Sequence, residues 1–223
     1  MSFQIAIDGP AGAGKSTIAK KIADTLSFIY VDTGALYRAL ACFFLKRQTD
    51  IENKEELQKA CDEADVEIDY RDGEQVVLLN GENVNPYLRS EEVSQMSSRS
   101  SKDPIVRSHL LSLQRNLAET CNVVMDGRDI GTVILPDAQV KIFLTASVET
   151  RAMRRYLEYQ AKNVPCDLPS IEKQIRDRDY QDIHRDVSPL VPAEDAVSID
   201  TSDLSIEEVT EKILSICRER FGN

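Results

Sequence analysis

The N-terminal segment joins a short apolar run, a glycine loop and an amphipathic run, and this order constrains the fold more than any other feature. The apolar run covers residues 3–7, and the loop from Gly9 to Ser16 reads G-P-A-G-A-G-K-S. Apolar residues then recur at helical spacing after Gly14, at Ile18, Ala19, Ile22 and Leu26. The loop matches the pattern G-x-x-x-x-G-K-[ST] in full, between a strand and a helix, as that pattern requires.

This loop predicts a site for a nucleoside triphosphate. Glycines let successive backbone N–H groups turn inward to phosphate oxygens, and the helix N-terminus adds partial positive charge. Lys15 should reach the β- and γ-phosphates, and the Ser16 hydroxyl should bind Mg²⁺. The residues expected to contact ATP are Gly9, Pro10, Ala11, Gly12, Ala13, Gly14, Lys15, Ser16 and Thr17.

Four further apolar runs of strand length alternate with helix-forming sequence. They cover residues 28–31, 122–125, 140–144 and 197–199. Short apolar strands that alternate with amphipathic helices predict an α/β fold, with a five-stranded parallel sheet and helices on both faces. A helical stretch is expected over 35–46, and a capping box of Ser205 and Glu208 should open a last helix that ends near Arg220.

One segment breaks this alternation. Two β-rich runs, 66–70 and 75–79, flank the turn signal Asp72-Gly73, and a second turn signal, Asn80-Gly81, precedes Val84. Glycine after aspartate or asparagine between apolar runs is typical of a hairpin. The segment therefore predicts a small antiparallel meander, inserted at about residues 62–87.

Length and composition exclude several classes of protein. A chain of 223 residues has room for one α/β core with inserts. The net charge of −11 argues against sequence-independent binding of nucleic acid, and no apolar run approaches the roughly 20 residues that span a bilayer. The start of the chain has no leader pattern, so we expect a cytoplasmic protein and, by default, a monomer. Neither a disulfide framework nor a zinc site is indicated by the scattered Cys42, Cys61, Cys121, Cys166 and Cys217.

Three polar clusters stand out in the sequence. Two directly follow predicted strands, and the third lies before the last predicted strand. They are D-T-G-A-L-Y-R from Asp32, D-G-R-D from Asp126, and an arginine-rich stretch from Arg176 to Arg185. Singly, each has a structural explanation as a helix cap, a turn or a row of helix ion pairs. Ligands of open α/β sheets bind at the carboxyl ends of the strands, so together the clusters predict an acceptor site beside the phosphate loop.

Other nucleotide-binding classes fit less well. A GTPase needs N-K-x-D, whereas Asn53-Lys54-Glu55-Glu56 only approaches this pattern and lies before the insert. The L-S-G-G-Q signature of ABC-type ATPases is absent from the sequence. A small-molecule kinase is therefore favoured over a molecular switch.

The four motifs together resemble bacterial cytidylate kinases (CMP kinases) over nearly the whole chain. The resemblance implies ATP-dependent phosphorylation of CMP and dCMP in pyrimidine nucleotide metabolism. It also implies a single kinase domain over 1–223, which divides into a core, a part that binds the nucleoside monophosphate, and a helical lid. The expected bounds are 1–34, 103–150 and 186–223 for the core, 35–102 including the insert for the monophosphate-binding part, and 151–185 for the lid.

The resemblance also assigns roles on the acceptor side. Arg38 and Arg128 should hold the acceptor phosphate, because a planar guanidinium pairs well with phosphate. Asp129, together with Ser98 and Arg107, should read the amino group of cytosine, with the Asp129 carboxylate as the acceptor. The full set of expected CMP contacts is Thr33, Tyr37, Arg38, Ser98, Arg107, Arg128, Asp129, Arg178, Asp182 and Arg185. Many family members carry serine where Ala11 stands, so that contact with the acceptor phosphate should be lost or taken by backbone.

An acceptor phosphate is already a nucleophile near neutral pH, since its second pKa is ~6, so no general base is needed. Catalysis should rest on Lys15, Mg²⁺, Arg128 and the lid arginines Arg154, Arg155 and Arg178. Ser16 should bind Mg²⁺ directly and Asp126 through water, with Asp32 as the alternative acid. The adenine is expected near residues 201–203. A kinase for uridylate, adenylate or shikimate, and a non-enzymatic nucleotide switch, remain the alternatives.

Overall fold

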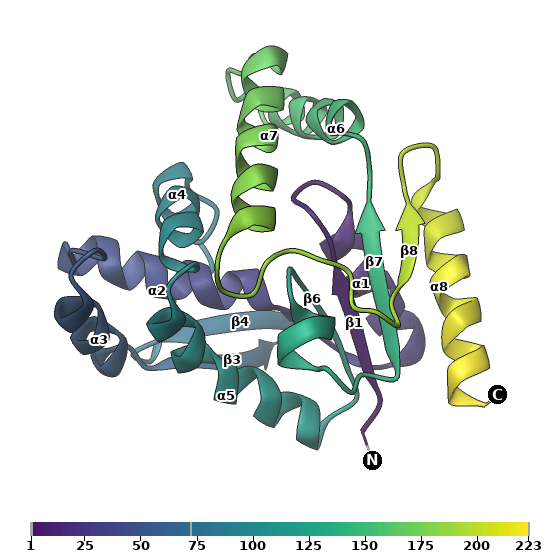
Figure 1. The fold of residues 1–223 in the computed structure, drawn as a ribbon, viewed down its shortest axis with the longest axis horizontal. Helices are drawn as coiled ribbons and strands as arrows, with labels where there is room; N and C mark the ends of the chain where they lie inside the picture. The colour runs from purple at the N-terminus through teal and green to yellow at the C-terminus, as the bar shows by residue number, and fades with distance from the viewer. Residues whose placement is uncertain (1, 72, 223) are drawn as a thin grey trace. The chain divides into compact units, whose positions relative to one another are not determined.

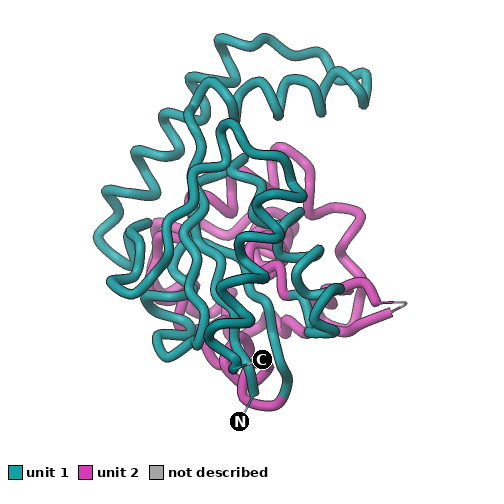
Figure 2. Tube along the Cα trace, turned by 90° about the vertical axis from the view of Figure 1, so that its right-hand side faces the viewer, with its two compact units in different colours: residues 1–30, 121–223 teal, residues 31–120 magenta. Residues whose placement is uncertain are grey.

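The computed structural model describes residues 2–71 and 73–222, so Asp72 of the predicted turn Asp72-Gly73 lies outside the described residues. The chain forms two compact units (Figure 2). Unit 1 contains residues 1–30 and 121–223, and unit 2 contains residues 31–120. The division into core, monophosphate-binding part and lid stays a prediction.

A parallel sheet of five strands confirms the predicted α/β fold (Figure 1). Its strand order is β2-β6-β1-β7-β8, and β1 pairs in parallel with both β6 and β7. The crossovers between parallel strands put the carboxyl ends of β1, β6 and β7 at one edge. The strands are β1 (Gln4–Asp8), β2 (Ile29–Asp32), β6 (Val123–Gly127), β7 (Val140–Thr145) and β8 (Val197–Asp200).

Two helices of unit 1, α1 (Lys15–Leu26) and α8 (Ile206–Phe221), cover one face of the sheet. Ile5 and Ile7 of β1 pack there with Ile22 of α1 and Ile213 of α8. The predicted capping box is present at the start of α8. Alternate residues of a strand point to opposite faces, so Ala6 and Asp8 face the other side, where the π-helical turn η1 (Ile130–Ile134) packs against β1.

The arginine-rich segment of unit 1 folds as two helices. They are α6 (Val148–Ala161), which follows β7, and α7 (Leu168–His184). Their small apolar contact contains Ala152, Ile171 and Ile175, separate from the core of the sheet. Among the described residues, no helix is long and apolar enough to cross a membrane.

Unit 2 is built around α2 (Thr33–Arg47), whose Leu36, Leu40 and Phe44 are fully buried. The helix begins two residues earlier than predicted, because the Asp32 side chain caps it. The remaining helices are α3 (Lys54–Glu63), α4 (Glu91–Ser100) and α5 (Pro104–Thr120). The side chain of Asn53 caps α3, so the sequence that approached N-K-x-D is a helix start.

The predicted meander is present in unit 2 as a three-stranded antiparallel sheet. Its strands are β3 (Val66–Arg71), β4 (Glu74–Leu79) and β5 (Glu82–Asn83). Val66, Val77 and Leu79 join the same apolar core as α2 and the Val106 and Leu110 side chains of α5. The insert is therefore an integral part of the unit 2 core.

Candidate active site

The glycine loop after β1 has a backbone conformation that residues with a side chain rarely adopt. Gly9 has φ 146°, and a Cβ there would lie 1.9 Å from the carbonyl oxygen of Leu144. Gly12 and Gly14 also have positive φ, at 79° and 88°, and Gly14 caps α1. The glycines therefore fix a tight loop at the N-terminus of α1, where backbone N–H groups and the helix dipole favour phosphate.

Lys15 is buried at the base of this loop, with 6% of its surface exposed, and its Nζ donates to the carbonyl oxygen of Pro10 at 2.8 Å. Burial lowers the pKa of Lys15 to about 7, and the nearby charge of Arg128 acts in the same direction. Asp126 opposes this shift. The structure thus brings the phosphate-loop lysine and the arginine of D-G-R-D into one electrostatic environment.

Ser16 and Asp126 form the candidate magnesium site of unit 1. The Ser16 hydroxyl donates to Asp126 Oδ2 at 3.0 Å, and the Tyr30 hydroxyl donates to Asp126 Oδ1 at 2.8 Å. Hydroxyl and carboxylate oxygens are ligands that Mg²⁺ prefers, directly or through water. The described residues contain no cluster of three or more His, Cys, Asp or Glu side chains that could hold a metal by itself. The two oxygens fit a magnesium ion that arrives with a nucleotide.

Asp8 is a site residue that sequence reasoning missed. Its carboxylate accepts from the backbone N–H groups of Ile130 and Gly131 at 2.8 and 2.7 Å, which fixes the turn directly after Asp129. Burial raises the pKa of Asp8 to about 6, although these two hydrogen bonds oppose the shift. An acid at the end of an otherwise apolar strand, next to the glycine loop, was the available signal.

Unit 1 brings five of the predicted acceptor-side residues into two ion-pair groups. Arg128 Nε donates to Asp182 Oδ2 at 2.9 Å, and Arg178 Nε lies 4.0 Å from the same oxygen. Burial alone would raise the pKa of Asp182, but the charges of Arg128 and Arg178 hold it below its usual value. Arg185 lies 3.7 Å from Asp129 Oδ1, and Asp129 is only 4% exposed. The two residues directly after β6 therefore meet charged residues of α7 and its C-cap, about 50 positions later in the sequence.

The predicted lid arginines Arg154 and Arg155 contact other groups. Arg154 donates to the carbonyl and hydroxyl oxygens of Thr201, and the Thr201 hydroxyl lies 3.1 Å from the Thr145 carbonyl oxygen and 3.3 Å from that of Ala13. Arg155 packs on the ring of Tyr159 and donates to its hydroxyl at 2.9 Å. Residue 201, where the adenine was expected, thus lies beside the glycine loop with Arg154.

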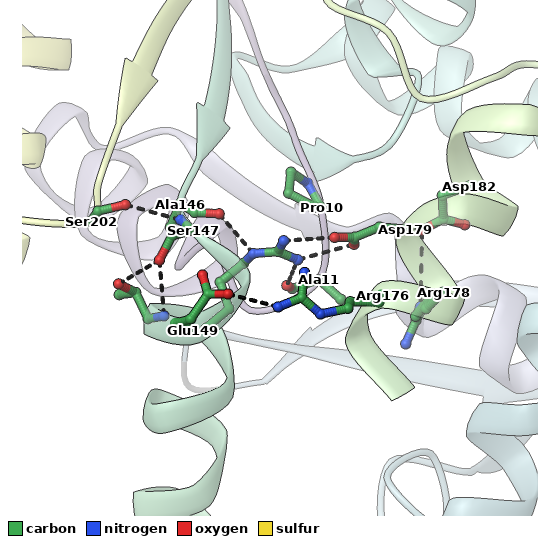
Figure 3. A network of polar contacts seen from close by, with 12 residues as sticks. Pro10, Ala11, Ala146, Ser147, Glu149, Arg176, Arg178, Asp179, Asp182 and Ser202 are labelled. Atoms are coloured by element: carbon green, nitrogen blue, oxygen red, sulfur yellow. Dashed lines mark hydrogen bonds and ion pairs between the residues drawn. The ribbon is translucent and has the colours of Figure 1, made fainter. Parts of the chain in front are cut away.

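Arg151 is a further residue that sequence reasoning did not select. Its guanidinium donates to three partners: the carbonyl oxygen of Ala146 at 2.9 Å, that of Ala11 at 3.1 Å, and both carboxylate oxygens of Asp179 at 3.0 and 2.6 Å. Figure 3 shows these partners converging from the end of β7, the glycine loop and α7. With 3% of its surface exposed, Arg151 forms a buried clamp between the glycine loop and α7.

Removing this clamp should destabilise the protein. Arg151→Met leaves the largely buried Asp179 carboxylate without its cation, so the free energy of unfolding is expected to fall by about 3 kcal/mol. The matched control is Arg176→Met, since Arg176 pairs with Glu149 in solvent and its loss should lower the free energy of unfolding far less. Urea denaturation measures both values, and equal losses in the two variants would contradict the clamp.

Unit 2 holds the remaining acceptor-side residues. Arg38 Nη2 donates to Asp32 Oδ2 at 2.9 Å, and Arg38 Nε is buried with no hydrogen-bond partner among the described residues. The Arg107 guanidinium lies 5.4 Å from the centre of the Tyr37 ring and donates to the Ser101 carbonyl oxygen at 3.0 Å. Asp32 therefore caps α2 and pairs with Arg38. Asp126, the other acid considered for Mg²⁺, contacts Ser16 instead.

Ser98 and Thr33 complete the predicted acceptor set. Ser98 lies on α4, one helical turn before the Ser101 carbonyl that Arg107 binds, and its surface is half-buried. Thr33 is buried at the first position of α2. Thr33 thus shares α2 with Arg38, whereas Ser98 lies on α4, the helix that precedes α5 and its Arg107.

A parallel sheet with a glycine loop after its first strand, a buried lysine in that loop and a serine beside an acid define a P-loop nucleoside-triphosphate-binding protein. A family model described as cytidylate kinase matches residues 5–219. The chain belongs to the cytidylate kinase family, which confirms the resemblance seen in the sequence.

Curated relatives cover essentially the whole chain. The cytidylate kinase of Geobacillus sp. (strain WCH70) is 49% identical over 221 residues, which is 99% of each chain. That of Thermotoga neapolitana is 48% identical over 222 residues, again 99% of each chain. Among solved structures, shikimate kinase from Bacteroides thetaiotaomicron is similar with a TM-score of 0.47 and 10% identity, over 97% of this chain and 98% of that one. A likeness of that size carries no argument about function.

Proposed function

We propose that the protein transfers the γ-phosphoryl group of ATP to CMP or dCMP, which yields ADP and the cytidine diphosphate. Membership of the cytidylate kinase family supports this reaction. The observation that carries the choice of base is Asp129, a buried carboxylate held beside Arg185. A carboxylate accepts from the N4 amino group of cytosine and repels O4 of uracil, so it suits the first base and not the second.

The residues of unit 1 support a mechanism of positioning and charge neutralisation. Lys15, Arg128 and Arg178 gather positive charge around the glycine loop, where negative charge spreads over the transferring phosphoryl group. Ser16 would hold Mg²⁺ and Asp126 would orient its waters, and the ion would neutralise charge on the phosphate oxygens. The acceptor phosphate attacks without a general base, because it is ionised near neutral pH.

Arg38 and Arg128 are the proposed ligands of the acceptor phosphate. The buried Nε of Arg38, which has no partner among the described residues, supports this role, since a buried donor without an acceptor is unfavourable until an anion binds. Tyr37, Arg107 and Ser98 are proposed to contact the nucleoside. The expected cytoplasmic location and monomeric state stay predictions.

A panel of acceptors tests the proposal. ADP release with Mg-ATP would be followed for CMP, dCMP, UMP, AMP, GMP and shikimate, and kcat/KM compared. CMP and dCMP are expected to lead by at least about tenfold, equivalent to ~1.4 kcal/mol. A lead by UMP, AMP or shikimate would favour the corresponding kinase. If no acceptor raises turnover above background, the nucleotide-dependent switch becomes the better description.

A further inference from the structure

One side chain of the meander contacts the residue that holds Arg38. Gln75, near the start of β4, bonds both peptide groups of Asp32 through its side-chain amide. The Asp32 N–H donates to Gln75 Oε1 at 2.8 Å, and Gln75 Nε2 donates to the Asp32 carbonyl oxygen at 3.3 Å. A glutamine amide can do this because it presents a donor and an acceptor side by side. The contact fixes the backbone of Asp32 at two points.

The Asp32 side chain transmits this position to Arg38. Its Oδ1 accepts from the Ala35 N–H at 3.0 Å, and its Oδ2 accepts from Arg38 Nη2 at 2.9 Å. Both oxygens therefore have set directions, and the guanidinium of Arg38 follows the carboxylate. A Cβ on Gly34 would lie 3.0 Å from Arg38 Nη1, so the guanidinium rests against the backbone of the first turn of α2.

The end of the meander holds Gln75 in place. The side chain of Asn85 donates to the Gln75 carbonyl oxygen at 2.8 Å and accepts from the Val77 N–H at 2.9 Å. These are the backbone groups of β4 that lie beyond the two residues of β5. Asn85 thus replaces a strand partner, and the backbone that carries Gln75 is fixed on this side.

We propose that Gln75 is a positioning residue of the acceptor side, which fixes Asp32 and, through Asp32, directs the guanidinium of Arg38. The inference rests on the proposed function, in which Arg38 binds the acceptor phosphate. It gives the meander a role in the reaction: the insert braces a phosphate-binding arginine from a strand that is 43 positions away from Asp32 in the sequence. All of these contacts lie within unit 2.

Steady-state kinetics of Gln75→Leu test the inference, because leucine removes both bonds at similar volume. KM for CMP is expected to rise about five- to tenfold, the loss of one or two hydrogen bonds, while KM for ATP changes less than about twofold. The matched control is Gln58→Leu, since Gln58 is an exposed glutamine of unit 2 whose side chain donates to Asp62 in the same helix. Its KM for CMP should stay within about twofold of wild type.

A double-mutant cycle separates positioning from general stability. In an Arg38→Lys background, Gln75→Leu should raise KM for CMP by less than about twofold, because no guanidinium remains to be directed. An equal rise in both backgrounds would overturn the inference. Should Gln75→Leu not fold in a thermal melt, Gln75→Glu keeps the acceptor for the Asp32 N–H, and its KM for CMP should rise at least about twofold. An unchanged value would again overturn the inference.

The wild-type protein in the same assay distinguishes the two levels of proposal. If CMP does not stimulate its turnover, the proposed function fails and the role of Gln75 fails with it. If wild type phosphorylates CMP and Gln75→Leu has the same KM for CMP, only the inference about Gln75 fails.

Discussion

Lys15→Met is expected to lower kcat with saturating Mg-ATP and CMP by about 10³-fold, while the protein remains folded. The Nζ of Lys15 is buried at the base of the glycine loop, close to Arg128 and Arg178, and in the proposed mechanism charge on the transferring phosphoryl group develops there. Methionine keeps most of the volume of lysine and removes the charge. Because the lost interaction is strongest in the transition state, kcat should fall more than KM for ATP rises.

Proton uptake on nucleotide binding provides the second readout for Lys15. With a pKa of about 7 in the free protein, Lys15 is mostly neutral at pH 8, and the phosphates of ATP favour its charged form. Binding of Mg-ATP should therefore take up about 0.9 proton at pH 8 and about 0.1 at pH 6. Calorimetry in buffers of different ionisation enthalpy measures this, with Lys15→Met as the control. Equal uptake by both proteins would show that another group binds the proton.

Asp129→Asn should reduce the preference for CMP over UMP, expressed as the ratio of kcat/KM values, by about 10³-fold. The buried carboxylate of Asp129 presents only acceptors, so O4 of uracil, which is also an acceptor, can form no hydrogen bond with it. Asparagine supplies one amide donor that can bond O4 of uracil. The rate with CMP should fall, and the rate with UMP should rise.

Asp137, an exposed aspartate between η1 and β7, is the control position for Asp129→Asn. Asp137→Asn removes one negative charge from the surface and should leave the CMP to UMP ratio unchanged. A uniform loss of activity in Asp129→Asn, with the ratio unchanged, would contradict base reading. It would instead indicate that Asp129 supports Arg185 and the turn that follows.

Local sequence signals predicted most of the fold. The strands of unit 1 are short apolar runs because both faces of the parallel sheet are covered, and each observed strand lies within two residues of its predicted bounds. The capping box of Ser205 and Glu208 could be predicted from the sequence because all its partners lie within four residues. The π-helical turn after Asp129 was not predicted, since its geometry depends on the distant carboxylate of Asp8.

Residues of the candidate site could be predicted from the sequence only where they belong to a motif with a known chemical role. The glycine loop predicted Lys15 at the start of the helix after β1, and D-G-R-D predicted Arg128 directly after a strand, which is where the structure has them. Arg151 looked like one of several helix cations, since its partners at Ala11 and Asp179 come from other elements. The same holds for Gln75, which the sequence presents as an ordinary polar residue of a strand. Contacts between distant segments decide both roles.

The bond between Arg151 and Ala11 uses the main-chain carbonyl of the loop and not a side chain. Every amino acid supplies that oxygen, so the loop can exchange the residue at position 11 without losing its attachment to α6. Position 151 has no such freedom, because only a guanidinium reaches all three partners at once. A different side chain at position 11 would therefore change the groups that the loop presents to a substrate, whereas the bond from Arg151 to the loop backbone would remain.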